Sequence, residues 1–288
     1  MAQTPSAEGT APAWRQWAAV AGGLLIASGW IAFIIALAPA LMGDGSNLWR
    51  YAVFMLMIYV PLLPIALIGG WLCRSRVLRL GQSPGVWMAA GILIGAGGVS
   101  ASLLMSWLNG GVVPGSGMSG FSLAVGLGMM LTLVQASMEE VLFRGWLQPV
   151  LAARWGAMAG VLASALLFAL FHLIGGARAP VTLAFIMLAG VLFGLLTQRT
   201  GGLAASVAAH AAWNITEGSV FGLVPNPGTE LFGSILDFDL AGPPIWGGSD
   251  EGLNASVGTL MVMAAMLLPL LAIGLPRSGT PTRPGLPV

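Results

Sequence analysis

Long, unbroken runs of apolar residues dominate the chain. A helix needs about 20 such residues to cross the core of a bilayer, and eight runs are about that long or longer. Strands of a transmembrane barrel would instead alternate apolar and polar residues. The pattern therefore predicts an all-α polytopic membrane protein with about eight transmembrane helices. The predicted spans are Trp17–Met42, Tyr51–Cys73, Val86–Leu108, Phe121–Phe143, Trp155–Ile174, Pro180–Gln198, Gly202–Leu223 and Ala255–Leu275.

Composition supports this prediction and narrows the possible functions. Of the 288 residues, 57% are hydrophobic and 7% are charged, whereas a soluble domain has roughly 25% charged residues. These values exclude a soluble enzyme and a disordered chain. The net charge of +1 also leaves no basic patch for a nucleic acid, so the lipid bilayer is the expected partner. The single cysteine, Cys73, cannot form an internal disulfide.

The arginines are distributed unevenly between the two sides of the predicted bundle. Eight helices place both termini on one side, where nine arginines fall, against only Arg50 and Arg178 on the other. The positive-inside rule then predicts that both termini are cytoplasmic. All eleven basic residues are arginine, which together with abundant Ala and Gly suggests a bacterial inner membrane protein. We expect no signal peptide, because the first apolar run is too long for one.

Some predicted helices carry glycines four residues apart, such as Gly91 and Gly95, and Gly190 and Gly194. Small residues at this spacing let two helix backbones approach closely. In a chain with 42 glycines, composition alone also produces such pairs. The spacing is therefore consistent with close helix packing without requiring it.

The polar groups inside the spans are few, and an ionisable side chain in a bilayer indicates function by default. They fall on three predicted helices, so the bundle can bring them together around a polar intramembrane cavity. The structural alternatives are an ion pair near the membrane surface, hydrogen-bonded core histidines and polar contacts between helices. The groups are Glu139, Glu140 and Arg144 in the fourth span, His172 in the fifth, and His210 and Asn214 in the seventh.

Helical geometry assigns different tasks to the two carboxylates. Glu140 and Arg144 are four residues apart and share a face, so they can pair. Glu139 lies about 100° around the axis and is left for proton chemistry. Phe168 and His172 share a face in the same way, so the two rings should pack together.

The third group offers hydrogen-bond donors rather than a base. His210 and Asn214 are four residues apart and present two neutral donors on one face. Glu217 follows nearer the outer surface, where we expect it to cap the span or to meet water, outside the site. A carboxylate beside an imidazole can activate water, and two donors can stabilise an oxyanion. These groups suit hydrolysis of an acyl bond without a serine or cysteine nucleophile.

The three sequence segments also resemble the motifs of a known family. EEVLFR at residues 139–144, FALFH at 168–172 and HAAWN at 210–214 are similar to the EExxxR, FxxxH and HxxxN motifs of the CAAX prenyl endopeptidase and bacteriocin-processing (CPBP, type II CAAX, Abi) family. The motifs occur in the family's order, on separate predicted helices. The resemblance covers about residues 131–221, and helices before it look like the family's variable N-terminal region.

The resemblance implies an intramembrane glutamic endopeptidase that needs no cofactor. Glu139 would activate water, His172 would hold it, and His210 and Asn214 would form the oxyanion hole. Glu140, Arg144 and Phe168 would be supporting residues. The substrate would be a peptide or a membrane-anchored protein, with or without a lipid group.

The expected organisation follows from the spans and the motifs together. The catalytic core helices occupy residues 121–223, after variable N-terminal transmembrane helices at 17–120. One extracytoplasmic loop spans 224–254, and the last transmembrane helix spans 255–275. Cytoplasmic tails at 1–16 and 276–288 complete the prediction.

Three alternatives and one conflict remain at this stage. Two His and two Glu are plausible zinc ligands, although no HExxH motif is present. The same polar groups would also suit a transporter, and a catalytically idle scaffold or immunity protein would keep them without using them.

The conflict concerns the depth of the site in the membrane. Glu139 ends an inward-running predicted helix and His172 an outward-running one, so either the spans extend further or the site lies in the middle of the bilayer.

Overall fold

The computed structural model describes residues 11–43, 47–117, 119–223 and 229–272. Five helical segments in these ranges are long and apolar enough to cross a membrane, and two shorter apolar helices accompany them. The predicted all-α polytopic membrane fold is confirmed. The two tails at 1–10 and 273–288, with Arg277 and Arg283, lie outside the described residues, and the predicted domain boundaries stay predictions. The five segments are Ala13–Ala36, Leu48–Cys73, Pro84–Leu108, Leu123–Trp155 and Pro180–Thr200.

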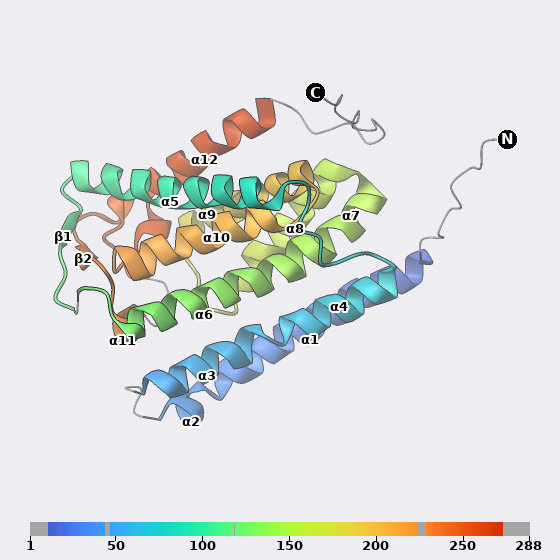
Figure 1. Ribbon diagram of the computed structural model, residues 1–288, viewed down its shortest axis with the longest axis horizontal. Coiled ribbons are helices and arrows are strands. Elements are labelled where there is room, and N and C mark those ends of the chain that lie inside the picture. Colours follow the sequence, from blue (N-terminus) through green and yellow to red (C-terminus); the bar gives the residue numbers. More distant parts are fainter. Residues whose placement is uncertain (1–10, 44–46, 118, 224–228, 273–288) are drawn as a thin grey trace.

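The first helices form a unit that we call the N-terminal hairpin. It consists of α1 (Ala13–Ala36), α2 (Ala38–Met42), α3 (Leu48–Tyr59) and α4 (Leu62–Cys73). In Figure 1 the hairpin runs alongside the remaining helices, with α1 and α4 packed against each other. Its main anchor is the fully buried indole of Trp146, which fills the space beside Gly23 of α1 and Gly69 of α4. A Cβ at either glycine would overlap this ring, so these positions must stay small.

The remaining helices form the core bundle. They are α5 (Pro84–Leu108), α6 (Leu123–Glu140), a π-helix η1 (Val141–Leu147), α7 (Gln148–Trp155), α8 (Ala157–His172), α9 (Pro180–Thr200), α10 (Ala204–Asn214), a second π-helix η2 (Ile215–Val220) and α12 (Val257–Ala272).

Close glycine packing holds α5 against α10. A Cβ at Gly91 or Gly95 would overlap backbone atoms of α10 near Ala205 and Ala209. The close helix packing that the glycine spacing allowed is present here, and it gives α5 a role that the sequence did not suggest. Helix α5 fixes the backbone of α10, which carries His210 and Asn214.

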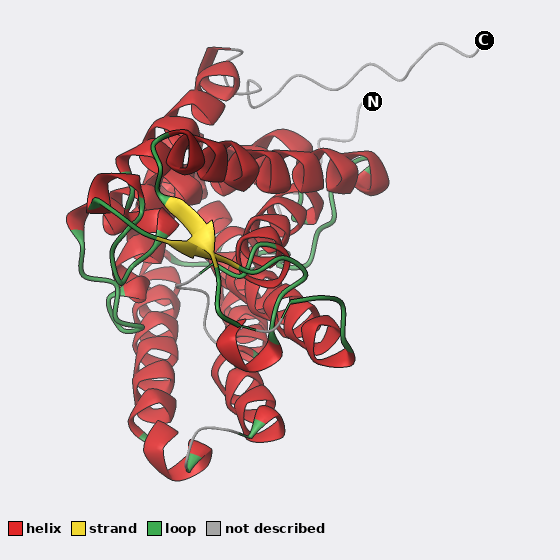
Figure 2. Cartoon of the chain, turned by 90° about the vertical axis from the view of Figure 1, so that its left-hand side faces the viewer, coloured by secondary structure: helices red, strands yellow, loops and turns green. Residues whose placement is uncertain are grey.

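The loop between η2 and α12 closes one end of the bundle, which we call the loop end. Its described part contains α11 (Thr229–Phe232), β2 (Phe238–Leu240) and two 3-10 turns, η3 (Pro244–Trp246) and η4 (Leu253–Ala255). Strand β2 pairs antiparallel with β1 (Val112–Pro114), with Val113 opposite Asp239. Figure 2 shows this ribbon at the face turned toward the viewer.

Exposed tryptophans mark both ends of the bundle. Trp14, Trp71 and Trp155 lie where α1 begins and where α4 and α7 end. Trp49 and Trp107 lie at the opposite, loop end. Tryptophan is enriched where a membrane meets water. The two groups of rings are therefore placed as the two interfaces of a membrane-embedded bundle.

The fourth predicted span was wrong at its end. The sequence suggested an exit after Phe143, but α6, η1 and α7 continue as one helical segment, Leu123–Trp155. The polar side chains after Phe143 do not end the helix because they find partners inside the bundle. Arg144 and Gln148 donate to the carbonyl oxygens of Gly190 and Gly194 at 3.0 Å each. Glu139 is thus in the middle of a long helix, which removes the predicted conflict in depth.

Candidate active site

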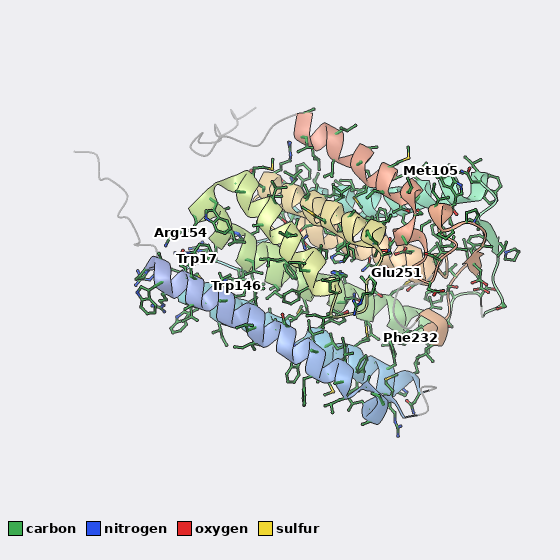
Figure 3. All side chains as sticks on the ribbon, turned by 180° about the vertical axis from the view of Figure 1, so that it is seen from behind. Trp17, Met105, Trp146, Arg154, Phe232 and Glu251 are labelled. Atoms are coloured by element: carbon green, nitrogen blue, oxygen red, sulfur yellow. The ribbon has the colours of Figure 1, made fainter. Side chains whose placement is uncertain are left out.

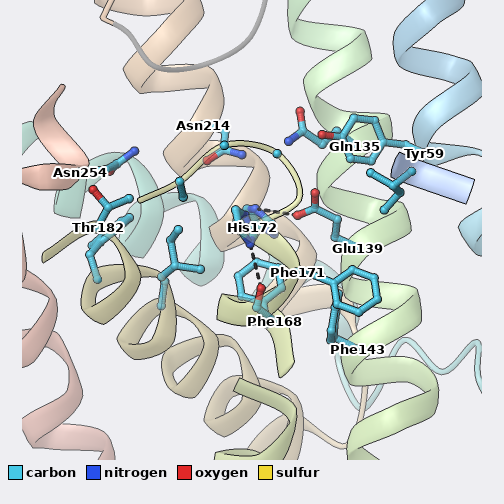
Figure 4. A pocket seen from close by; sticks show the side chains of 18 of the residues that line it. Tyr59, Gln135, Glu139, Phe143, Phe168, Phe171, His172, Thr182, Asn214 and Asn254 are labelled. Atoms are coloured by element: carbon cyan, nitrogen blue, oxygen red, sulfur yellow. Dashed lines mark hydrogen bonds and ion pairs between the residues drawn. The ribbon is translucent and has the colours of Figure 1, made fainter. Parts of the chain in front are cut away.

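The predicted catalytic residues meet at one cavity of about 400 Å³ inside the bundle. Glu139 of α6, His172 of α8, and His210 and Asn214 of α10 all line it. Figure 4 shows Glu139, His172 and Asn214 pointing into this shared space. The chain segments that carry these residues are far apart in the sequence, so the bundle itself assembles the group.

The pair Glu140 and Arg144 lies behind this cavity and does not line it. Arg144 Nη1 donates to Glu140 Oε1 at 2.8 Å, and both side chains are fully buried. The second guanidinium nitrogen, Nη2, donates to the carbonyl oxygen of Gly190 at 3.0 Å. The guanidinium also lies 4.4 Å from the ring centre of Phe168, a cation–π distance. The predicted ion pair is confirmed, and it is embedded in protein rather than near a surface.

His210 connects the two carboxylates. Its Nδ1 lies 3.0 Å from Glu140 Oε1, and its Nε2 lies 3.7 Å from Glu139 Oε2. Phe193 stacks on the imidazole at 4.8 Å, and Phe168 meets it edge-on. Because a carboxylate only accepts hydrogen bonds, Nδ1 carries the proton. Nε2 can then donate only when the ring is doubly protonated, which differs from the neutral donor that the sequence suggested.

His172 is held in one orientation at the end of α8. Its Nδ1 lies 2.8 Å from the carbonyl oxygen of Phe168, so Nδ1–H is the donor and Nε2 keeps its lone pair in the neutral ring. The rings of Phe168 and His172 pack edge-on at 4.6 Å, as predicted. Because His172 lines the cavity, the imidazole presents a proton acceptor to it.

Two π-helices follow the motif residues, and neither was predicted. Helix η1 begins directly after Glu140, and η2 begins directly after Asn214. A π-helical turn takes up an extra residue and often occurs at functional sites. Nothing in the apolar pattern separates such a turn from an ordinary helix, so it could not be predicted from the sequence.

Other polar residues at the cavity were also missed. Tyr59 of α3 and Gln135 of α6 line the wall next to Glu139, and Thr182 of α9 lines the opposite side. Gln135 is one helical turn before Glu139, a spacing that could have drawn attention to it. Tyr59 gives no such signal, because only the packing of the N-terminal hairpin brings it to the site.

The expectation that Glu217 caps the span or meets water near the outer surface was wrong, whereas it does lie outside the cavity lining. Its side chain is fully buried in η2 rather than exposed at the outer surface. Asn254, from the loop before α12, donates to Glu217 Oε2 at 3.2 Å. Because Asn254 also lines the cavity, this contact fastens the loop beside the cavity.

A second carboxylate fastens the same loop. Glu251 Oε1 accepts hydrogen bonds from the backbone N–H groups of Arg178 and Ala179, at 3.0 and 2.8 Å, before α9 begins. Burial alone would raise the pKa of this carboxyl, but its hydrogen bonds and the charge of Arg178 outweigh that and lower the pKa below 4.5. Asp250 and Glu251 line the cavity, so the cavity extends toward the loop end.

The described residues contain no group of three His, Cys, Asp or Glu side chains arranged to hold a metal ion. Glu139, Glu140 and His210 are close to one another, and Glu140 Oε1 is paired with both Arg144 Nη1 and His210 Nδ1. Whether the activity depends on a metal ion is tested by adding a chelator to the cleavage assay.

Comparison with known proteins connects this geometry to a family. No curated protein and no solved structure gives a significant match to the chain. The family model of the type II CAAX prenyl endopeptidase Rce1-like proteins matches residues 119–216. The matched range contains each of the motif residues, from Glu139 to Asn214. Residues 119–216 are therefore a domain of the type II CAAX prenyl endopeptidase family, the family that the three motifs indicated.

Proposed function

We propose that the protein is an intramembrane endopeptidase that uses Glu139 to activate water. The observation that carries the proposal is the division between two adjacent carboxylates. Glu139 lines the cavity beside His172, while Glu140 is bound by Arg144 and His210 outside it. The family match supplies the kind of reaction, hydrolysis of a peptide bond. The geometry supports the proposed division of roles.

In this mechanism, water binds between Glu139 and Nε2 of His172. Glu139 takes one proton while the water oxygen attacks the peptide carbonyl carbon, so a C–O bond forms and the carbonyl becomes an oxyanion. The tetrahedral intermediate then collapses. The C–N bond breaks, and the proton held by Glu139 passes to the leaving nitrogen. The site returns to its starting state with one water consumed.

The oxyanion is stabilised by His210 and Asn214. Asn214 donates from its amide, and His210 donates from Nε2 in its doubly protonated form. Donors aimed at a developing oxyanion typically contribute ~10²–10³ in rate each.

The substrate class is a membrane-anchored protein or peptide. The cavity lies inside a bundle whose outer surface is apolar, and its wall combines polar groups with Ile31, Ile58 and Leu62 of the N-terminal hairpin. Such a wall suits an apolar or lipid-modified segment. The arginine distribution supports an inner membrane protein with both termini in the cytoplasm.

The test compares protein termini in membranes from cells that carry the parent protein or Glu139→Gln, using mass spectrometry. New termini that require the parent protein support the proposal and identify substrates. Equal termini, with both proteins expressed and an added membrane-anchored reporter left intact, contradict it and favour a scaffold or a transporter. Cleavage that a chelator stops would instead indicate a metal-dependent site.

A further inference from the structure

Gln135 differs from the other polar side chains of α6 that precede Glu139. Thr132 and Ser137 each donate to a carbonyl oxygen one turn back in the helix, at 3.0 and 2.7 Å. Gln135 is buried and lines the cavity, and within the described part of the chain its amide makes no hydrogen bond to protein. A buried amide without a partner costs free energy. A molecule that enters the cavity would supply the missing partner.

A second glutamine in the same helical segment shows the contrast. Gln148 is also buried, but it does not line the cavity. Its amide donates to the carbonyl oxygen of Gly194 at 3.0 Å and so holds α7 against α9. The same chemical group therefore serves the packing of the bundle at Gln148, whereas at Gln135 it faces the space beside Glu139.

Tyr59 adds a second polar group to the same side of the cavity. It is the last residue of α3, and its neighbours Ile58 and Leu62 are apolar and line the cavity as well. Figure 4 shows Tyr59, Gln135 and Glu139 on one side of the cavity. A hydroxyl from the N-terminal hairpin and an amide from the core bundle thus lie beside the proposed catalytic carboxylate, in an otherwise apolar wall.

The backbone of a peptide inside the bundle needs such groups. Once a segment is extended for cleavage, its N–H and C=O groups lose their helical partners, and neither lipid nor apolar side chains replace them. Gln135 lies one helical turn, about 6 Å, from Glu139 along α6. An extended chain advances about 3.3 Å per residue. The Gln135 amide is therefore spaced to meet the backbone about two residues from the cleaved bond.

We propose that Gln135 binds the backbone of the substrate at this position, with the hydroxyl of Tyr59 as a further donor to the same segment. A side-chain amide both donates and accepts, so it can pair with the C=O and the N–H of one residue, as a neighbouring strand does. The inference rests on the proposed peptidase function. It makes the substrate an extended apolar segment that is held by its backbone, so the side chain of the bound residue can vary.

The first test separates binding from chemistry. Gln135→Met removes the amide but keeps the length and the helix propensity of the side chain, and Gln148→Met makes the same exchange outside the cavity. The probe is a membrane-anchored reporter whose cleavage by the parent protein requires Glu139. We expect Gln135→Met to raise KM about tenfold and to leave kcat within about twofold, because the lost contact is equally strong before and during the reaction.

The matched control and the opposing outcomes make this test specific. Gln148→Met should stay within about twofold of the parent protein in both KM and kcat. An unchanged KM in folded Gln135→Met, or a fall in kcat alone, would overturn the subsite and leave the proposed function intact. A parent protein that cleaves no reporter in a Glu139-dependent way would contradict the proposed function itself.

A modified reporter tests whether the contact is to the backbone. An ester in place of the amide two residues before or after the cleaved bond removes an N–H group and keeps every side chain. The parent protein should cleave one of these two esters about tenfold less efficiently than the amide reporter, whereas Gln135→Met should cleave both alike. Equal cleavage of all reporters by the parent protein, or the same ester penalty in Gln135→Met, would refute backbone binding.

Tyr59→Phe keeps the experiment decisive if Gln135→Met unfolds. The exchange removes only the hydroxyl and preserves the ring, so the thermal unfolding midpoint should stay close to that of the parent protein. KM should rise several-fold, with kcat within about twofold. An unchanged KM in folded Tyr59→Phe, where Gln135→Met gives no folded protein, would overturn the proposal.

Discussion

The two faces of α6 and η1 differ in how their polar groups are satisfied. Behind the cavity, Glu140 and Arg144 are fully buried and pair with each other, and Arg144 also donates to the carbonyl oxygen of Gly190. At the cavity, Glu139 and His172 face open space. The two glutamates are adjacent in the sequence, yet one belongs to a closed network and the other to a chamber that can admit water and substrate.

Because of this difference, we expect the residues behind the cavity to affect the stability of the bundle and the residues at the cavity to affect catalysis. A buried charge is tolerated only when partners surround it, so the network behind the cavity should determine whether the bundle folds. A group that performs catalysis must keep part of its hydrogen-bonding capacity available for the reacting atoms. Figure 3 shows Trp146 where the N-terminal hairpin meets the core bundle. Variants of the two faces should therefore fail in different assays.

Glu139→Gln should produce the largest effect, and only on activity. The amide keeps the size of the side chain but cannot take a proton from water, so cleavage should fall about 10³-fold. The thermal unfolding midpoint should stay within a few degrees, because the amide keeps the size of the side chain and the contact of Glu139 with His210 Nε2 is long, at 3.7 Å. Cleavage of a membrane-anchored reporter in detergent, followed beside unfolding, measures both. A variant that unfolds readily would show that Glu139 is structural and that the two faces are not separate.

Arg144→Met should produce the largest loss of stability. It leaves Glu140 buried with a charge and without its main partner, which costs about 3–5 kcal/mol. The double variant E140L/R144M removes both charges, so its unfolding free energy should lie closer to that of the parent protein. It should still be inactive, since His210 loses the carboxylate that orients it. Chemical unfolding in detergent compares the three proteins, and a double variant less stable than Arg144→Met would refute this account of the network.

Sequence reasoning recovered the parts of this site that depend on spacing along one helix. The Glu140–Arg144 pair and the Phe168–His172 contact follow from residues four apart. It failed where a partner comes from another helix. The fourth predicted span ended too early, at Phe143, because the bonds of Arg144 and Gln148 to carbonyl oxygens of α9 cannot be seen until the helices are packed. Glu217 was expected to lie near the surface for the same reason, because its partner comes from a distant segment of the chain.

Gln148→Leu tests a smaller part of the network behind the cavity. The side chain is buried and donates from Nε2 to the carbonyl oxygen of Gly194 at 3.0 Å. That carbonyl lies within α9, so losing the donor should cost only about 1 kcal/mol. Cleavage should change less than twofold, because no catalytic group moves. The unfolding free energy and the reporter assay provide the measurements, and a loss of activity that exceeds the loss of stability would place Gln148 with the cavity face instead.

The smallest effect concerns pH and the loop beside the cavity. The hydrogen bonds of Glu251 hold its pKa below 4.5 in the folded protein. Its contribution is therefore fully present above pH 4.5 and is lost as the pH falls through the lower, folded-state pKa. Amide hydrogen exchange of Arg178 and Ala179 should accelerate over that acidic range in the parent protein. In Glu251→Ala, which has no side-chain oxygen to accept from these N–H groups, their exchange should already be fast at neutral pH and, once corrected for intrinsic chemistry, should change little on acidification. Equal protection in both proteins at pH 7 would show that the loop is held by Asn254 and Glu217 alone, so that the carboxylate at the rim of the cavity is free to meet a substrate.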